Sequence, residues 1–155
     1  MAKTKAHTAY KLKDGTRVKG VTTILNNLGW NKNILVAWAR RTALAGDDPD
    51  AVLKEAGAIG TLAHYLCECD IKGEKADTED YSAEQIEKAE NAFLGYLEWK
   101  KMTKPKYEAI ELKMVSEKYK VGGTADFIAR INGSLVLGDF KTSKGIYPEM
   151  TCQLA

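Results

Sequence analysis

Two aspartates and a lysine near the end of the chain have the spacing that a tight β hairpin would bring together. Asn132-Gly133 is the dipeptide that most strongly favours a two-residue hairpin turn, and β-rich segments flank it on both sides. A turn of that length places Asp126 directly opposite Asp139, at a non-hydrogen-bonded pair whose Cα atoms lie about 4.5 Å apart. The two-residue period of a strand also places Lys141 on the same face as Asp139.

This acid pair predicts a cation site. Like charges directly opposite each other destabilise a sheet, and Asp is a poor strand former. Two ionised carboxylates this close need a shared proton or a cation between them. A hard divalent cation is the simplest resolution, with Mg²⁺ the expected ion and Mn²⁺ a substitute. Lys141 would orient or deprotonate a water, or neutralise a phosphate. The alternative is an exposed hairpin on which these residues form only a surface charge cluster.

Periodicity and turn signals predict the elements that must hold this hairpin. Its other face is apolar and is expected to be buried, with Ala125, Phe127, Ala129 and Ile131 against Val136 and Phe140. Helices are predicted at 21–28, at 33–44, from Asp48-Pro49 to about Ile71 with a break near Gly57 or Gly60, from the capping box Ser82-Ala83-Glu84-Gln85 to Pro105, and from Pro148. β structure is predicted as a hairpin over 8–19 around Asp14-Gly15, a strand at 107–115, a break at Gly122-Gly123, and strands at 124–131 and 134–141.

The same residues resemble a known family. Gly123-Thr124-Ala125-Asp126, followed by Gly138-Asp139-Phe140-Lys141, is similar to the G-x-x-D and D-x-K segments of the PD-(D/E)XK nuclease superfamily. The similarity is to the branch that contains the RecB nuclease domain and phage-type exonucleases. Gly60-Thr61-Leu62-Ala63-His64 resembles the helical histidine motif of that branch, and Gln153 stands at its Gln helix. Val21-Thr22-Thr23-Ile24-Leu25 with Trp38-Ala39 also looks like phage members.

The resemblance implies a metal centre. In the family pattern, Asp126 and Asp139 would ligate the ion, with the backbone carbonyl of Phe140 as a further ligand. His64 would ligate the same ion from its helix. Lys141 would activate or position the attacking water. The implied reaction is metal-assisted hydrolysis of a DNA phosphodiester bond.

Further residues receive roles through the same resemblance. Glu111 matches the auxiliary acid of the family. Glu108 and Glu111 are three apart on one strand, so only one of them can face the site. Gln153 would touch the substrate or brace the site. Substrate contacts are expected from the residues that follow the lysine, namely Thr142, Ser143 and Lys144.

The cysteines indicate neither a disulfide framework nor a cluster. Cys67, Cys69 and Cys152 are too few and too oddly placed for disulfides, which predicts a reducing cytoplasm. Iron–sulfur nucleases of the branch carry a Cys before the histidine and several near the C-terminus, and that pattern is absent, so no iron–sulfur cluster is expected. Glu68 shares a helical face with His64 and is either a partner of the imidazole or a solvated residue.

Charge is unevenly distributed along the 155 residues. Residues 1–41 carry a net charge of +8, residues 42–100 a net charge of −9, and residues 101–155 a net charge of +3. A basic arm and a basic C-terminal third permit a polyanionic partner, here DNA; the alternative is a solvated surface of mixed sign. No apolar run approaches the roughly 20 residues that span a bilayer, so no membrane partner is expected. The resemblance leaves open a homo-oligomer and a single-strand-binding or annealing protein as partners.

Together these observations predict one mixed α/β (α+β-like) domain over 1–155 with a restriction-endonuclease-like core. Residues 1–104 would be mainly helical after an initial hairpin, and 105–155 would hold the catalytic sheet and the start of the Gln helix, with the C-terminal part of the core missing. The expected activity is a metal-dependent deoxyribonuclease, most consistent with a phage or prophage exonuclease of recombination. The alternatives are a structure-specific endonuclease, an inactive DNA-binding module and a purely structural subunit.

Overall fold

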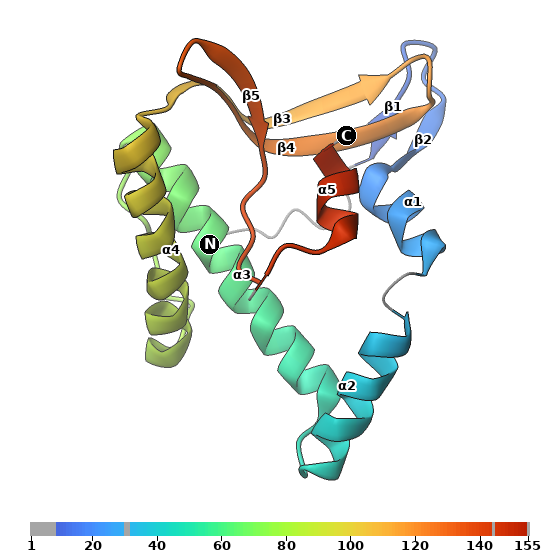
Figure 1. Cartoon of the computed structure of the whole chain (residues 1–155), viewed down its shortest axis with the longest axis vertical. Helices are drawn as coiled ribbons and strands as arrows, with labels where there is room; N and C mark the ends of the chain where they lie inside the picture. Colours follow the sequence, from blue (N-terminus) through green and yellow to red (C-terminus); the bar gives the residue numbers. More distant parts are fainter. Residues whose placement is uncertain (1–8, 30–31, 144, 155) are drawn as a thin grey trace. The chain divides into compact units, whose positions relative to one another are not determined.

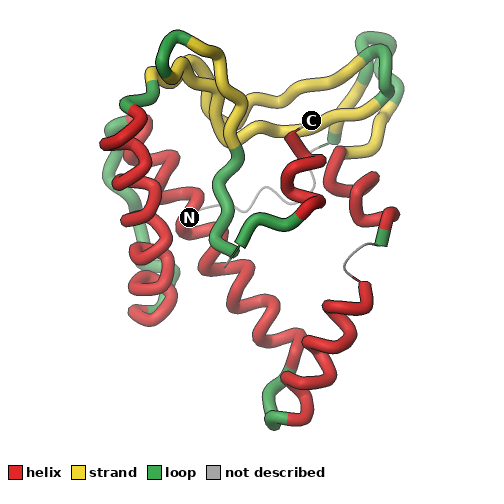
Figure 2. Tube along the Cα trace, viewed as in Figure 1, coloured by secondary structure: helices red, strands yellow, loops and turns green. Residues whose placement is uncertain are grey.

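The computed structural model describes residues 9–29, 32–143 and 145–154, which form a mixed α/β structure with a mixed five-stranded sheet (Figures 1 and 2). The helices of this part of the chain are α1 (Val21–Leu28), α2 (Lys32–Leu44), α3 (Pro49–Lys72), α4 (Ala83–Thr103) and α5 (Pro148–Leu154). Its strands are β1 (Tyr10–Lys11), β2 (Arg17–Gly20), β3 (Lys106–Ser116), β4 (Val121–Ile131) and β5 (Ser134–Gly138).

The described residues divide into two compact units. A helical unit comprises residues 32–102, and a sheet unit comprises residues 9–29, 103–143 and 145–154. The initial hairpin and α1 therefore belong with the C-terminal sheet. The prediction that they form part of a mainly helical half over residues 1–104 is wrong. None of the described helices combines the length and hydropathy that a bilayer crossing requires.

The helices of the helical unit begin and end at the predicted signals. The Asp48 side chain accepts a hydrogen bond from the N–H of Asp50 at 3.0 Å, and Pro49 occupies the first turn of α3. α3 then runs unbroken to Lys72, so the predicted break near Gly57 or Gly60 is wrong. At α4 the capping box is confirmed, because Ser82 and Gln85 each donate a backbone N–H to the other's side chain, at 3.0 and 3.2 Å.

The helical unit has its own core between α3 and α4. Leu62 and Ala89 are fully buried there, and Ala63 is 3% exposed. At one end of this contact the Asp70 carboxylate accepts a hydrogen bond from the Tyr96 hydroxyl at 2.7 Å and pairs with the Lys100 ammonium. Ile86 and Ala92 of α4 are partly buried and pack against this core.

The sheet unit is organised around β4. β3 pairs antiparallel with β4 along its whole length, from Lys106 beside Arg130 to Ser116 beside Val121. On the other edge of β4, β2 pairs in parallel at Val121 and Gly122, and β5 pairs antiparallel from Phe127 to Ile131. α1 and α5 contact each other and lie next to each other beside the sheet (Figure 1). On β4, Ala125, Phe127 and Ala129 are buried, as the alternation predicted.

The register predicted from Asn132-Gly133 is confirmed. Ile131 pairs with Ser134, and the ladder continues without a shift to Phe127 beside Gly138. The first hairpin is also confirmed, although its loop is longer than two residues: the N–H of Leu12 donates to the carbonyl of Thr16 at 2.9 Å. The second strand of the main hairpin was predicted to reach residue 141, and it ends at Gly138.

The predicted break at Gly122-Gly123 is wrong, because both glycines lie inside β4. The side chain of Tyr10 covers Gly122, where an added Cβ would lie 2.2 Å from the Tyr10 Cγ. The Tyr10 hydroxyl is also hydrogen-bonded to the Thr124 hydroxyl at 2.9 Å. Gly122 is thus needed for the close approach of an aromatic ring from β1, and not for a turn.

The two neighbouring glycines allow a test of this packing. Gly122→Ala should lower the free energy of unfolding by about 1–3 kcal/mol, because its methyl group overlaps the Tyr10 side chain. Gly123→Ala is the matched control on the same strand, since its Cβ would meet only the Val21 Cγ2 at an ordinary 3.8 Å. Urea unfolding followed by circular dichroism measures both variants. Equal stabilities of the two would contradict the packing described here.

Candidate functional site

The candidate site lies where two strands end on the same edge of β4. β2 ends at Gly20 beside Gly122, and β5 ends at Gly138 beside Phe127. Because β2 is parallel and β5 antiparallel to β4, their carboxyl ends point toward each other along this edge. Residues 123–126 lie between them, where the chain leaves the sheet into α1 on one side and into residues 139–143 on the other. Points where chains diverge from the carboxyl ends of strands are where α/β sheets commonly bind ligands.

Asp126 ends the β4–β5 ladder with its side chain. Its Oδ2 accepts a hydrogen bond from the backbone N–H of Phe140 at 2.5 Å. In a continued antiparallel ladder that N–H would face a main-chain carbonyl of β4 instead. The carboxylate of Asp126 therefore contacts the residue that directly follows Asp139, so Asp126 of β4 lies next to the segment that carries Asp139.

Asp139 is held by two donors from its own unit. Its side chain is 9% exposed, its Oδ2 pairs with the Lys141 ammonium, and its Oδ1 accepts a hydrogen bond from the Gln153 Nε2 at 3.1 Å. The Lys141 side chain is 32% exposed, so solvent can reach this ion pair. Burial of a carboxylate is costly unless it is paired and hydrogen-bonded, and both conditions are met here. Gln153 thus braces the site from α5, one of the two roles expected of it.

Apolar rings support the diverging chain beside the acids. The Phe140 ring lies 5.0 Å from that of Phe127, and Tyr107 meets Phe127 edge-on at 5.6 Å. Gly138 leaves room for this contact, because a Cβ there would lie 1.9 Å from the Phe127 Cζ. The aromatic stack fixes Phe140, and with it the N–H that Asp126 accepts.

Glu111 occupies the level of Asp126 on the neighbouring strand. Ile110 pairs with Phe127 and Leu112 with Ala125, so the register places Glu111 across from Asp126. Its φ of 51° lies in the left-handed region, which costs a non-glycine residue about 1–3 kcal/mol. Such strain inside a strand is uncommon and concentrates at functional sites. A register shift at Glu108 interrupts the regular alternation of β3, and Glu108 pairs with Arg130 at 2.6 Å. That only one of Glu108 and Glu111 faces the site stays a prediction.

Carboxylates such as those of Asp126 and Asp139 are ligands that Mg²⁺ can use. This ion is usually held by one or two carboxylates and keeps several waters and substrate phosphate oxygens as its other ligands. Within the described residues, no group of three or more His, Cys, Asp or Glu side chains is placed to hold a metal. The structure therefore brings Asp126 toward the Asp139 segment and does not gather Glu111 with them into a three-acid group.

The remaining predicted site residues are placed as follows. His64 is half-buried on α3 in the helical unit, and its metal role stays a prediction. Thr142 is exposed. Ser143 donates its hydroxyl to the carbonyl of Gly145 at 2.7 Å, which helps to turn the chain toward α5. Lys144 lies outside the described residues. Glu68 pairs with Lys72 one turn later on α3, which indicates a helix-surface ion pair.

Sequence reasoning missed Tyr10 and Thr124. Their hydroxyl groups are hydrogen-bonded to each other, and Thr124 lies on β4 two residues before Asp126. The sequence signal at this place is Gly122, which lies beneath the Tyr10 ring inside β4 and not at the predicted chain break.

Comparison of the chain with models of known families, with curated proteins and with solved structures found no match.

The strain at Glu111 leads to a stability prediction. Both Glu111→Ala and Glu111→Gly remove the carboxylate, but only glycine adopts a φ of 51° without a steric cost. The Gly variant should therefore be more stable than the Ala variant by about 1 kcal/mol in urea unfolding.

Lys113 is the matched control, two residues further along β3 and not among the positive-φ residues. There the order should reverse, with Lys113→Ala about 0.5–1 kcal/mol more stable than Lys113→Gly. If Ala is also the better residue at position 111, the strained backbone described here is incorrect.

Proposed function

We propose that the chain is a Mg²⁺-dependent deoxyribonuclease with Asp126, Asp139 and Lys141 at its centre. The observation that carries the proposal is the contact between the Asp126 carboxylate and the N–H of Phe140, beside the Asp139–Lys141 ion pair. It supports a close acid pair with an ammonium group next to it, although the β4–β5 ladder ends at Phe127 and Gly138, one step before the predicted Asp126–Asp139 pair. The core of the sheet unit would then be restriction-endonuclease-like, with Mn²⁺ able to replace Mg²⁺.

In this proposal the protein groups divide the work of phosphodiester hydrolysis. Asp126 and Asp139 would hold the ion, and a bound Mg²⁺ would supply a water of lowered pKa and positive charge opposite the phosphoryl oxygens. The Phe140 N–H fixes one oxygen of Asp126, and the Gln153 amide fixes one oxygen of Asp139. Lys141, whose ammonium is paired with Asp139, would orient the attacking water. Glu111 is the auxiliary acid at the same level of the sheet.

Loss of the acids should remove both metal binding and cleavage. Asp126→Asn and Asp139→Asn should each weaken Mn²⁺ binding, measured by titration calorimetry, and lower Mg²⁺-dependent cleavage of linear DNA by at least about 100-fold. Lys141→Gln should lower cleavage by about 100-fold or more while it keeps Mn²⁺ binding, because the ammonium acts on the water and not on the ion.

Glu98→Gln is the control for charge, since it removes an exposed carboxylate of α4 in the helical unit. It should change neither Mn²⁺ binding nor cleavage. Cleavage by the Asp139→Asn variant at the wild-type rate would refute the proposed centre. DNA binding without turnover by the wild-type chain would favour the binding-module alternative.

The form of the substrate distinguishes the two nuclease classes. An exonuclease, the class that the family resemblance favours, should degrade linear duplex DNA and leave a covalently closed circle of the same sequence intact. Gel electrophoresis of both substrates in Mg²⁺ gives the result. Equal cleavage of the two would instead indicate an endonuclease. A homo-oligomer and a single-strand-binding or annealing partner stay predictions.

A further inference from the structure

Three basic side chains lie along one face of the β1–β2 hairpin. Lys11 is directly opposite Arg17, and Lys19 follows two residues later on the same strand face. All three are exposed, whereas Tyr10 and Val18 of the other face are half-buried and the adjoining Leu12 is buried. The hairpin thus has an inward apolar face and an outward basic face.

The positive charge on this face is not compensated within the described part of the chain. There, no ion pair joins Lys11, Arg17 or Lys19 to an acidic side chain. Asp14, in the hairpin loop, accepts a hydrogen bond from the N–H of Thr16 at 2.8 Å. Because like charges directly opposite each other destabilise a sheet, the Lys11–Arg17 pair costs stability unless an anion binds there.

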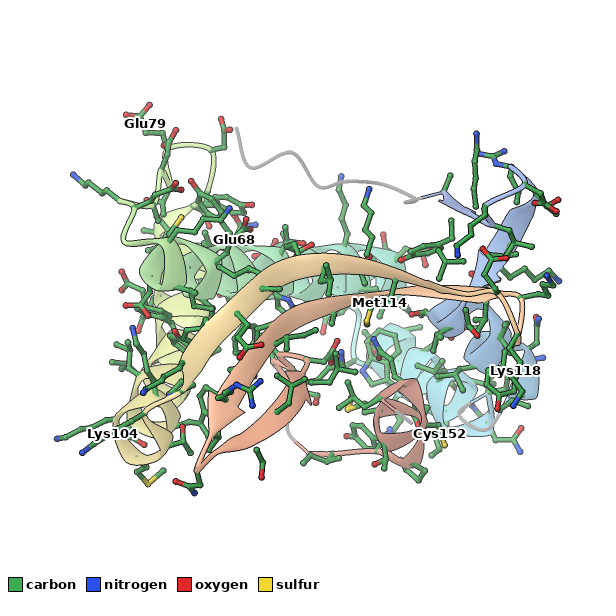
Figure 3. The ribbon with its side chains drawn as sticks, turned by 90° about the horizontal axis from the view of Figure 1, so that it is seen from above. Glu68, Glu79, Lys104, Met114, Lys118 and Cys152 are labelled. Carbon is green, nitrogen blue, oxygen red and sulfur yellow. The ribbon has the colours of Figure 1, made fainter. Side chains whose placement is uncertain are left out.

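A second turn adds charge and an aromatic ring to the same end of the sheet unit. The β3–β4 turn contacts the hairpin loop, since the Glu117 carboxylate accepts a hydrogen bond from the N–H of Lys13 at 2.8 Å. On this turn Tyr119 is 71% exposed, and the Lys118 ammonium lies 4.9 Å from the centre of its ring. Figure 3 shows Lys118 on this turn, at the end of the sheet. The hydrogen bonds of Thr16 lower the pKa of Asp14, and the Lys120 charge lowers it further, consistent with contact between the two turns.

We propose that this surface, made by Lys11, Arg17, Lys19, Lys118 and Tyr119, binds single-stranded DNA. Basic side chains that follow a phosphate backbone, together with an exposed aromatic ring on which a base can stack, are the features of non-specific single-strand sites. The exposed ring favours a nucleic acid over an anionic lipid surface, because bases offer a stacking partner. The choice of DNA as the polyanion rests on the proposed nuclease function.

The spacing along β4 connects this surface with the candidate site. Five residues of β4 separate Val121, at the turn, from Asp126, which corresponds to about 17 Å. Tyr10, Thr124 and Asp126 share one face of the sheet, whereas Lys11, Arg17 and Lys19 lie on the other face. A strand bound at the two turns would therefore pass the edge of the sheet to reach the acid pair.

Binding is measured apart from cleavage, with the full chain in EDTA and a fluorescent oligothymidylate of about twelve nucleotides, a length within the usual range of single-strand sites. K11E/R17E should weaken binding at least about 10-fold. It should also reduce the slope of the logarithm of the binding constant against the logarithm of the salt concentration by about 1.4, the change expected when two phosphate contacts are lost. Tyr119→Ala should weaken binding about 5- to 100-fold, and Tyr119→Phe should retain the wild-type affinity because it keeps the ring.

K54E/K101E is the matched control, because it makes the same charge change at two exposed lysines of the helical unit. It should bind like the wild type, and thermal melting should show that all variants are folded. Equal weakening in both double variants, or no effect of Tyr119→Ala, would overturn the proposal. The proposal would also be overturned if binding to phosphatidylserine vesicles requires Lys11 and Arg17 while binding to the oligonucleotide does not. If the wild type binds as expected but never cleaves DNA in Mg²⁺, the nuclease proposal fails and this one stands.

Discussion

The sheet unit depends on one substitution of partners, in which a carboxylate takes a hydrogen bond that a backbone carbonyl would otherwise accept. The Asp126 side chain receives the N–H of Phe140, so the β4–β5 ladder stops at Phe127 and Gly138. The chain can then leave the sheet without an unsatisfied donor at the point of departure. Asp139 and Lys141 project from this departing segment and not from a regular strand, and the Gln153 amide of α5 completes the contacts of Asp139.

Several features that cost stability occur at this same level of the sheet. Asp139 is 9% exposed, Glu111 has a left-handed backbone conformation, and β4 carries two adjacent glycines shortly before Asp126. Two of them have a specific neighbour, because Lys141 pairs with Asp139 and Tyr10 packs on Gly122. Departures from local preference that coincide in space are expected at functional sites.

The two units differ in how they are stabilised. The helical unit is held by a small apolar core at Leu62 and Ala89 and by the Asp70–Tyr96–Lys100 contacts between α3 and α4. The sheet unit is held by pairing around β4, and its polar groups gather at the ends of strands. The candidate acid pair and the basic surface of the two turns both belong to the sheet unit. We therefore propose that DNA cleavage and the binding of single-stranded DNA both take place on the sheet unit.

The sequence alone determined the features that depend on neighbouring residues. The turn at Asn132-Gly133 set the β4–β5 register, and the caps at Asp48 and Ser82 set two helix starts, because short-range hydrogen bonds decide these structures. Only the tertiary structure decided where β5 ends, why Gly122 is a glycine and how Glu111 is strained. Those outcomes depend on the contacts Asp126–Phe140 and Tyr10–Gly122 and on the pairing of β3 with β4. Residues far apart in the chain make the Tyr10–Gly122 contact, and no local pattern encodes which side chain will arrive there.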